Sequence, residues 1–159
     1  MSDLGTIDEH NTITFVRHFP GPIERVWAFL TDPMLLARWF SDGVVAERIG
    51  GEVRFEMGAD GRITAYDPPR LLEYTWNERE LSRGPIFDTL VRWELAEAGD
   101  RVRLTLTHKR LTGSEVIGHG AGWHALLDRL SASVDGNDLP DFWQRYSQLR
   151  DKYSEHYKE

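Results

Sequence analysis

Histidine is the residue type in this chain with the widest chemical scope, and the sequence contains six. His119 and His124 are five positions apart; on a helix that spacing turns their side chains about 140° away from each other, so they cannot chelate one ion together. The sequence has no HExxH motif and no Cys, which excludes the zinc-protease motif and any thiolate site. We therefore expect no metal and no cofactor.

His108 and His119 are the better candidates for a functional role. In a predicted strand, the side chain of His108 points to the same inner face as those of Leu104 and Leu106. His119 precedes Trp123 by one turn of a predicted helix. A neutral imidazole facing a cavity can both donate and accept a hydrogen bond. The simpler alternative, which we favour, places each ring at the cavity rim, bonded to a backbone carbonyl or to water.

Aromatic residues at inward-facing positions form a second group of candidates. Most of them are expected to be core, although a ring on a cavity wall would stack on a hydrocarbon or aromatic ligand. The group comprises Trp27, Trp39, Tyr74, Trp76, Trp93 and Trp123. Those on the wide sheet, Tyr74, Trp76 and Trp93, are the best candidates for lining one continuous cavity, and Trp39 and Trp123 are further ligand contacts.

Arg17 occupies an alternate position of the same predicted strand as Ile13 and Phe15, so its side chain is expected on their face of the sheet. Its guanidinium group is therefore a candidate for binding an anionic group of a ligand. The alternative is a structural pairing with a carboxylate such as Glu73 or Asp88. Arginines at strand ends are usually structural, and we favour that alternative.

No catalytic residue can be assigned from the sequence. There is no Cys, and the serines lack a partner base or a nucleophile-elbow context. A phosphate-binding glycine loop is also missing.

The length and net charge of the chain limit which kinds of protein and partner are possible. The 159 residues fit one domain, and the net charge of −7 argues against a nucleic-acid partner. No apolar run approaches the roughly 20 residues that a membrane span needs. The first residues lack a signal-peptide pattern, so a cytoplasmic location is expected.

Two hydrophobic periods divide the chain. Alternation with period two predicts strands at 12–19, 52–57, 61–66, 71–76, 87–95 and 101–109. This alternation places Met57 and Phe87 on inward faces. Helical spacing predicts two short helices at 22–32 and 33–40, and a long helix at 114–136. The order indicates an α+β domain in which the long helix covers one apolar face of an antiparallel sheet. One helix about 10 Å across cannot fill a wide sheet, which predicts an internal hydrophobic cavity beside it.

The last segment repeats Phe142, Tyr146, Leu149 and Tyr153 at helical spacing. An isolated helix of this length is marginal in water, so its apolar stripe must pack on something. One alternative is docking on the outside of the same domain, near the short helices or the long helix. The other is a homodimer through this helix, which Trp143 beside the stripe favours.

An ordered set of motifs resembles a known superfamily. The motifs are Arg17-x-Phe19-x-x-Pro22-x-x-x-Val26-Trp27, Thr31-Asp32-Pro33, Arg38-Trp39-Phe40, Gly50-Gly51-x-Val53-x-Phe55-x-Met57, Pro68-Pro69-x-x-Leu72-x-Tyr74-Thr75-Trp76 and Gly122-Trp123-x-x-x-Leu127-x-x-Leu130. Together they resemble SRPBCC, or START-like, proteins, and more narrowly the homologues of the heat-shock protein 90 ATPase activator. The resemblance covers about residues 12–136. Residues 1–11 are expected to be a flexible N-terminus and 137–159 an additional helix.

The resemblance implies a helix-grip fold, with six to seven strands wrapped around the long helix and a deep hydrophobic pocket. The first functional hypothesis is binding of a small hydrophobic or aromatic molecule. The alternatives are a cavity-based enzyme of the cyclase or hydrolase type, and a chaperone-interacting module. The ligand-contact candidates are Arg17, Trp39, Tyr74, Trp76, Trp93, His108, His119 and Trp123.

Overall fold

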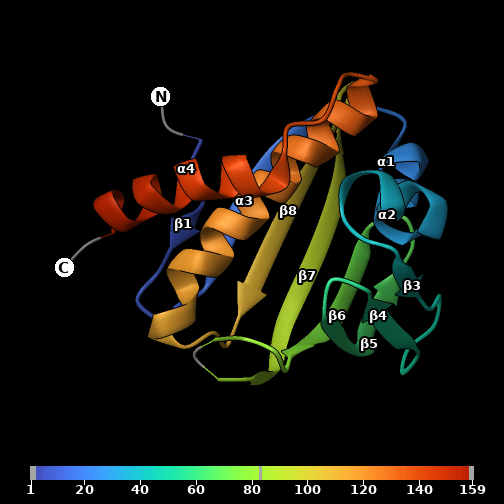
Figure 1. Ribbon diagram of the computed structural model, residues 1–159. Coiled ribbons are helices and arrows are strands. Elements are labelled where there is room, and N and C mark those ends of the chain that lie inside the picture. The colour runs from blue at the N-terminus through green and yellow to red at the C-terminus, as the bar shows by residue number, and fades with distance from the viewer. Residues whose placement is uncertain (1–2, 83, 158–159) are drawn as a thin grey trace.

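The computed structural model describes residues 3–82 and 84–157, which form eight strands and four helices (Figure 1). The strands are β1 (Thr6–Ile7), β2 (Ile13–Pro20), β3 (Gly43–Val45), β4 (Glu52–Phe55), β5 (Ala59–Asp67), β6 (Leu71–Glu78), β7 (Ile86–Ala98) and β8 (Arg101–Lys109). The helices are α1 (Ile23–Thr31), α2 (Pro33–Trp39), α3 (Gly113–Asp135) and α4 (Phe142–His156).

All strands belong to one antiparallel sheet in the order β1-β2-β8-β7-β6-β5-β4-β3. The pairing of β2 with β8 brings the first long strand beside the last. The predicted α+β class is confirmed, but the predicted strand number of six to seven is wrong. β1 and β3 have only two and three residues, too few to show a period of two.

Two inward positions predicted from alternation are also wrong. Met57 is 51% exposed because β4 ends at Phe55 and the chain turns there. Phe87 is 55% exposed, and its neighbour Ile86 is buried instead. The register between β6 and β7 shifts at this end of the pair, and a shift of one residue exchanges the two faces of a strand.

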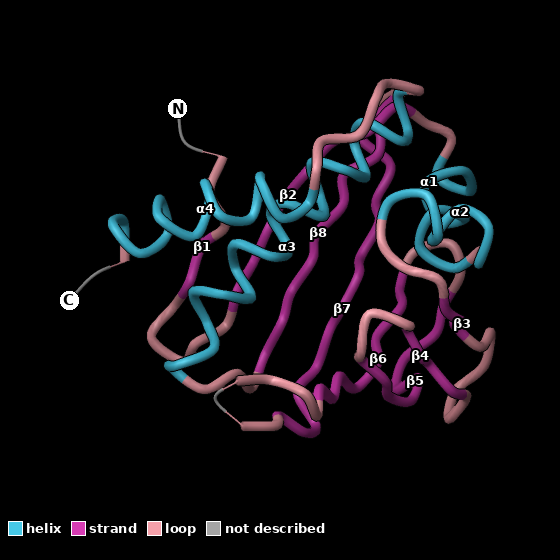
Figure 2. The backbone as a smooth tube through the Cα atoms, in the orientation of Figure 1, coloured by secondary structure: helices cyan, strands magenta, loops and turns pink. Residues whose placement is uncertain are grey.

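The long helix α3 covers one face of the sheet, lying over β2, β8 and β7 (Figure 2). Trp123, Leu127 and Leu130 are buried on its inner side, as the helical period predicted. Across the sheet Tyr74 lies opposite Val91 in the neighbouring strand, and side chains at alternate positions along these strands share the covered face.

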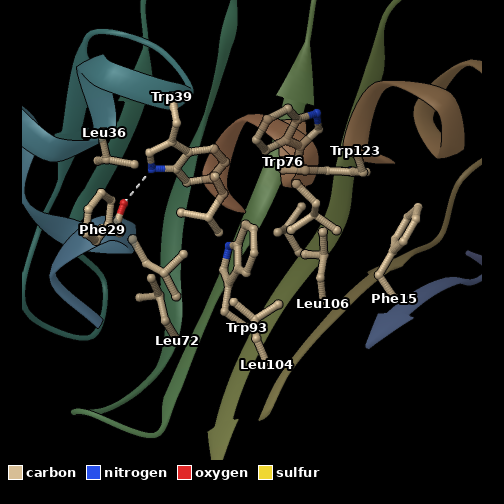
Figure 3. Packing of buried hydrophobic residues seen from close by; sticks show 14 of the residues in the cluster. Phe15, Phe29, Leu36, Trp39, Leu72, Trp76, Trp93, Leu104, Leu106 and Trp123 are labelled. Carbon is tan, nitrogen blue, oxygen red and sulfur yellow. Dashed lines mark hydrogen bonds between the residues drawn. The ribbon is translucent and has the colours of Figure 1, made fainter. Parts of the chain in front are cut away.

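The two short helices close the other end of the sheet, beside β3, β4 and β5 (Figure 1). Asp32 caps α2, because its side chain accepts a hydrogen bond from the backbone N–H of Met34 at 2.9 Å. Trp39 is fully buried and donates its indole N–H to the carbonyl of Phe29 in α1 at 2.8 Å (Figure 3). This bond ties the two helices together.

The last helix, α4, docks on α3 within the same chain. Leu149 and Tyr153 are buried there, which confirms the intramolecular alternative; a dimer through this helix stays a prediction. Gly118 and Gly120 lie at the contact between the two helices. A Cβ atom at Gly118 would lie 3.0 Å from the guanidinium end of Arg150, and one at Gly120 would lie 3.4 Å from the Tyr153 ring.

The first residues are held by the same helix. Tyr153 Oη accepts a hydrogen bond from the backbone N–H of Gly5 at 2.6 Å, and Tyr157 Oη donates to the Gly5 carbonyl at 2.7 Å. Ile7 pairs with Ile13 in the short β1–β2 ladder. Figure 1 shows both chain ends on the same side of the molecule. The segment 1–11, expected to be a flexible terminus, thus contains an anchored strand.

Candidate functional site

A cleft with a volume of about 730 Å³ lies beside α3, between the end of β6 and the first half of α4. Its aromatic lining comes from β6, α3, α4 and the residue after α2, and consists of Phe40, Trp76, Trp123, Phe142, Trp143 and Tyr146. A volume of this size accommodates a small organic ligand. The cleft is therefore the strongest candidate for a binding site.

An ion pair between His119 and Glu78 forms the polar part of the wall. His119 Nε2 lies 2.8 Å from Oε1 of Glu78, and its Nδ1 lies 2.9 Å from the backbone carbonyl oxygen of Glu115. Trp76 donates its indole N–H to the same Glu78 oxygen at 2.6 Å. The side chains of His119 and Glu78 are only 12% and 14% exposed, so the pair is largely withdrawn from solvent.

The partners of His119 determine its charge. Both ring nitrogens face oxygen atoms that act as acceptors, so both carry a proton and the ring is an imidazolium. Burial alone lowers the pKa of His119, but the hydrogen bond and negative charge of Glu78 outweigh it and the pKa is raised. Burial correspondingly raises the pKa of Glu78, and His119 and Trp76 reverse that effect, so the pKa is lowered. The geometry and both pKa shifts therefore favour the charged form of the pair.

His108, although close to His119, is a core residue in a closed hydrogen-bond chain. Trp123 donates its indole N–H to Nδ1 of His108 at 2.9 Å, which leaves the proton on Nε2, 2.9 Å from the Thr89 hydroxyl. Thr89 in turn donates to the carbonyl of Trp76 at 2.8 Å. The ring is fully buried, and burial, with the nearby charge of His119, holds its pKa well below the usual 6.5. His108 is therefore neutral and has both ring nitrogens in use.

The free energy of unfolding is expected to fall as the pH decreases below 6.5. The reason is that His108 becomes protonated in the unfolded chain while it stays neutral in the folded protein. When the folded and unfolded states differ by one bound proton, the free energy of unfolding changes by about 1.4 kcal/mol per pH unit. His124, whose pKa burial also lowers, adds to the same trend. The variant His108→Gln should show a clearly shallower dependence in urea titrations below pH 6.5.

The variant His119→Gln is the control for that measurement. The raised pKa of His119 means that its stabilising effect is fully present below 6.5 and is lost only as the pH rises through the folded-state pKa. Burial, the larger cause of the low pKa of His108, is still present when His119 is replaced, so most of the pH dependence below 6.5 should remain. An unchanged slope in His108→Gln would contradict the neutral assignment of His108.

The structure separates the predicted ligand contacts into two groups. Trp76, His119 and Trp123 line the cleft. The others from the sheet and α2 are packed core: Trp93 donates its indole N–H to Tyr74 Oη at 2.9 Å, and Trp39 bonds the backbone as described above. Figure 3 shows the indoles of Trp39, Trp93, Trp76 and Trp123 clustered between the sheet and the helices. The alternation of side chains correctly placed Tyr74 and Trp93 on the covered face of the sheet, but these two residues do not line the cleft.

Arg17 lies away from the cleft, on β2 beside the N-terminal segment. Its guanidinium donates to the carbonyl oxygens of Asp3 at 2.7 Å and of Val16 at 3.0 Å. Among the described residues, it forms no ion pair with Glu73 or Asp88. Glu73 pairs with Arg92 instead at 3.1 Å. Arg17 therefore has the structural role favoured from the sequence, with different partners.

Sequence reasoning missed Glu78 and the contribution of α4. Glu78 shares the parity of Tyr74 and Trp76 along β6, so the alternation could have identified it had the strand been extended by two residues. The α4 side chains carry no such signal, because their position depends on where the helix docks. Trp143, which is 71% exposed, lies at the cleft rim.

The fold and the cleft together define a class: an α+β protein with a single antiparallel sheet, one long covering helix and a ligand-sized aromatic cleft beside it. The chain belongs to the family described as activator of Hsp90 ATPase homolog 1-like protein, whose model matches residues 20–135. The helix α4 and β1 lie outside the matched range. The resemblance inferred from the motifs is thereby confirmed.

Comparison with solved structures agrees with this assignment. A Bordetella parapertussis protein is 32% identical with a TM-score of 0.78, over 96% of this chain and 88% of that chain. CalU16 from Micromonospora echinospora, in its crystal structure, is 25% identical with a TM-score of 0.76, over 95% and 92%. A Mesorhizobium loti protein shares the fold, at 22% identity and a TM-score of 0.70, over 80% and 99%. A comparison with curated protein sequences found no match. Within the described residues, no helix is long and apolar enough to cross a membrane.

Proposed function

We propose that the protein binds a small hydrophobic or aromatic molecule in the cleft between β6, α3 and α4. The observation that carries this proposal is an aromatic lining of ligand-sized volume around the buried His119–Glu78 pair. Binding sites for small molecules combine apolar walls with a few fixed polar groups in this way. The family membership supports a ligand-binding role of this general kind.

The cleft wall indicates how such a ligand would be oriented. Its ring or hydrocarbon part would pack mainly on Phe142, Trp143 and Tyr146, because these rings keep exposed surface, whereas Trp76 and Trp123 are each only 3% exposed. Oε1 of Glu78 is already used by Trp76 and His119. A ligand hydroxyl or amine would therefore find its acceptor in the second oxygen of this carboxylate. We expect ligands with one hydrogen-bond donor to bind more tightly than pure hydrocarbons.

The variant Trp143→Ala is expected to weaken binding of the fluorescent dye anilinonaphthalene sulfonate, which carries apolar aromatic rings and one sulfonate group, by roughly threefold to tenfold. The reason is that a stacked aromatic pair contributes about 0.5–1.5 kcal/mol beyond its buried area. Fluorescence titration of the native protein gives the dissociation constant. Trp143 is 71% exposed, so the melting temperature should change little.

The variant Gln148→Ala is the matched control, because this residue is an exposed position on the same helix outside the cleft lining. It should leave both the affinity for the dye and the melting temperature unchanged. Equal affinities for the wild type and Trp143→Ala would place the dye elsewhere and remove the support for this cleft.

Native mass spectrometry of the purified protein tests the biological ligand directly. A small molecule that co-purifies and is recovered chemically unchanged after incubation supports a binding protein. A molecule that is converted supports the enzyme alternative, since the His119 imidazolium beside Glu78 could donate a proton in the cleft. The His119→Gln variant would then abolish the conversion.

A further inference from the structure

A third histidine, His124, lies on another side of α3 and is fully buried. Its Nδ1 is 3.0 Å from Tyr153 Oη. Its Nε2 has no hydrogen-bond partner among the described residues. The nearest charged atoms are carboxylate oxygens of Asp3 at 3.5 Å and of Asp128 at 3.9 Å. A buried polar nitrogen without a hydrogen-bond partner is unfavourable, so this arrangement calls for a physical explanation.

The three side chains converge from two distant parts of the sequence. His124 and Asp128 are four residues apart on α3 and so lie on the same face of the helix. Asp3 comes from the N-terminal segment, which is fixed by the bond from Arg17 to the Asp3 carbonyl oxygen and by the bond from Gly5 to Tyr153. These two bonds hold the main chain at Asp3 and at Gly5, and so keep Asp3 close to His124.

The distances between the donor atoms fit a small divalent metal ion. The relevant atoms of Asp3, His124 and Asp128 all lie within 4.8 Å of one another. Bonds of about 2.0–2.2 Å at tetrahedral angles place neighbouring ligand atoms about 3.3–3.6 Å apart. The 3.5 Å separation between His124 and Asp3 falls in this range, and the 3.9 Å separation from Asp128 needs only a small side-chain adjustment.

We propose that His124, Asp3 and Asp128 form a binding site for a divalent first-row transition-metal ion such as Zn²⁺. One imidazole and two carboxylates are a suitable donor set for this ion, with water as the fourth ligand. The metal would take the lone pair of Nε2, and the ring proton would move to Nδ1 and be donated to Tyr153 Oη. A hydrogen bond from the second ring nitrogen is the usual way in which a metal-bound histidine is oriented.

This site differs from the one that the sequence argued against. The expectation of no metal rested on the divergence of His119 and His124 and on the absence of Cys, of an HExxH motif and of a clustered carboxylate–histidine spacing. It overlooked His124 and Asp128, which are four residues apart, whereas Asp3 is more than a hundred residues away and leaves no local signal. The ion would join the N-terminal segment to α3, and Tyr153 and Arg145 would connect it to α4 through their bonds to His124 and Asp128.

Neighbouring charges limit the strength of the site. Arg145 pairs with Asp128 at 2.7 Å, and Arg17 lies beside Asp3. These two guanidinium groups offset the two carboxylates, so the net charge that attracts a cation is small. We expect weaker binding than in a structural zinc site with thiolate ligands.

Isothermal titration of ZnCl₂ into chelator-treated and dialysed full-length protein tests the proposal. The wild type should bind one equivalent, and Asp3→Asn and Asp128→Asn should each bind roughly tenfold more weakly or worse. Asp3→Asn changes a side chain that is 70% exposed, so its folding should be unaffected. The nitrogen chemical shifts of the His124 ring should report metal at Nε2 and a proton at Nδ1.

Two variants serve as controls. Glu9→Gln removes another exposed N-terminal carboxylate, and His156→Gln removes a surface imidazole that lines a hollow together with Asp3. Both should keep the wild-type affinity for Zn²⁺. The proposal is overturned if the wild type binds no Zn²⁺, if Asp3→Asn and Asp128→Asn retain its affinity, or if His156→Gln abolishes binding.

Discussion

Deletion of residues 138–159 is expected to reduce the free energy of unfolding by about 5 kcal/mol or more, since each buried large side chain contributes about 1.5–3 kcal/mol. The deletion removes Leu149 and Tyr153, which are 1% and 0% exposed. It also leaves the N–H of Gly5 and Nδ1 of buried His124 without their partner. A loss of this size is comparable to the whole stability of many domains, so the shortened protein should be partly unfolded at 37 °C.

Point variants on α4 and a mass measurement make this result interpretable. Leu149→Ala should cost about 2–5 kcal/mol in urea unfolding, as buried leucines do, whereas the adjacent exposed change Gln148→Ala should cost less than about 0.5 kcal/mol. Light scattering of the full chain and of the deletion variant gives the oligomeric state. Equal stability of the two variants would contradict docking of α4, and a dimer that becomes monomeric on deletion would support an interface through this helix.

The variant Trp93→Ala is expected to destabilise the protein by about 3–5 kcal/mol, the range for a fully packed aromatic residue. Trp93 is 2% exposed, and its ring meets those of Trp39 and Trp123 edge to face at centroid distances of 6.3 and 5.6 Å. The change also leaves the buried hydroxyl of Tyr74 without its donor. Urea denaturation of the variant measures the loss.

The sequence made Trp93 a candidate for lining the cavity. The same variant therefore tests whether Trp93 is a packed core residue or a ligand contact. If Trp93 lined the ligand site, its truncation would weaken dye binding, whereas truncation of a residue packed away from the cleft should lower stability and leave the dye affinity of the folded protein unchanged. The rim variant Trp143→Ala is the comparison, since it removes the same side-chain type from an exposed position. If Trp93→Ala costs less than about 1 kcal/mol, the packed-core assignment is wrong.

Much of the fold could be predicted from local patterns. Alternation of apolar residues identifies β2 and β4 to β8, because successive side chains of a strand point to opposite faces whatever surrounds them. The same local geometry placed Tyr74, Trp76 and Trp93 on the covered face, where they are buried. The change to helical spacing located α3 to within a residue at each end. These features depend only on backbone repeats.

The predictions failed where a local pattern was too short or was interrupted. The two-residue β1 and the three-residue β3 show no period. The register shift in the β6–β7 pair moved Phe87 to the surface, and alternation alone contains no signal for such a shift. Glu78 was missed because the strand was ended two residues early.

The sequence by itself determined which faces are apolar, and only the tertiary structure decided which apolar residues line a cleft. Trp76 and Trp93 are both buried on the covered face of the sheet, yet only Trp76 lines the cleft, because the cleft lies where β6 ends, beside α3 and the first half of α4. The cleft therefore depends on where α4 docks, and the apolar stripe of α4 left that position open. The approach of Asp3 to His124 likewise depends on the folded positions of the chain end and α3. Periodicity is a property of neighbouring residues, whereas both sites arise from contacts between segments far apart in the chain.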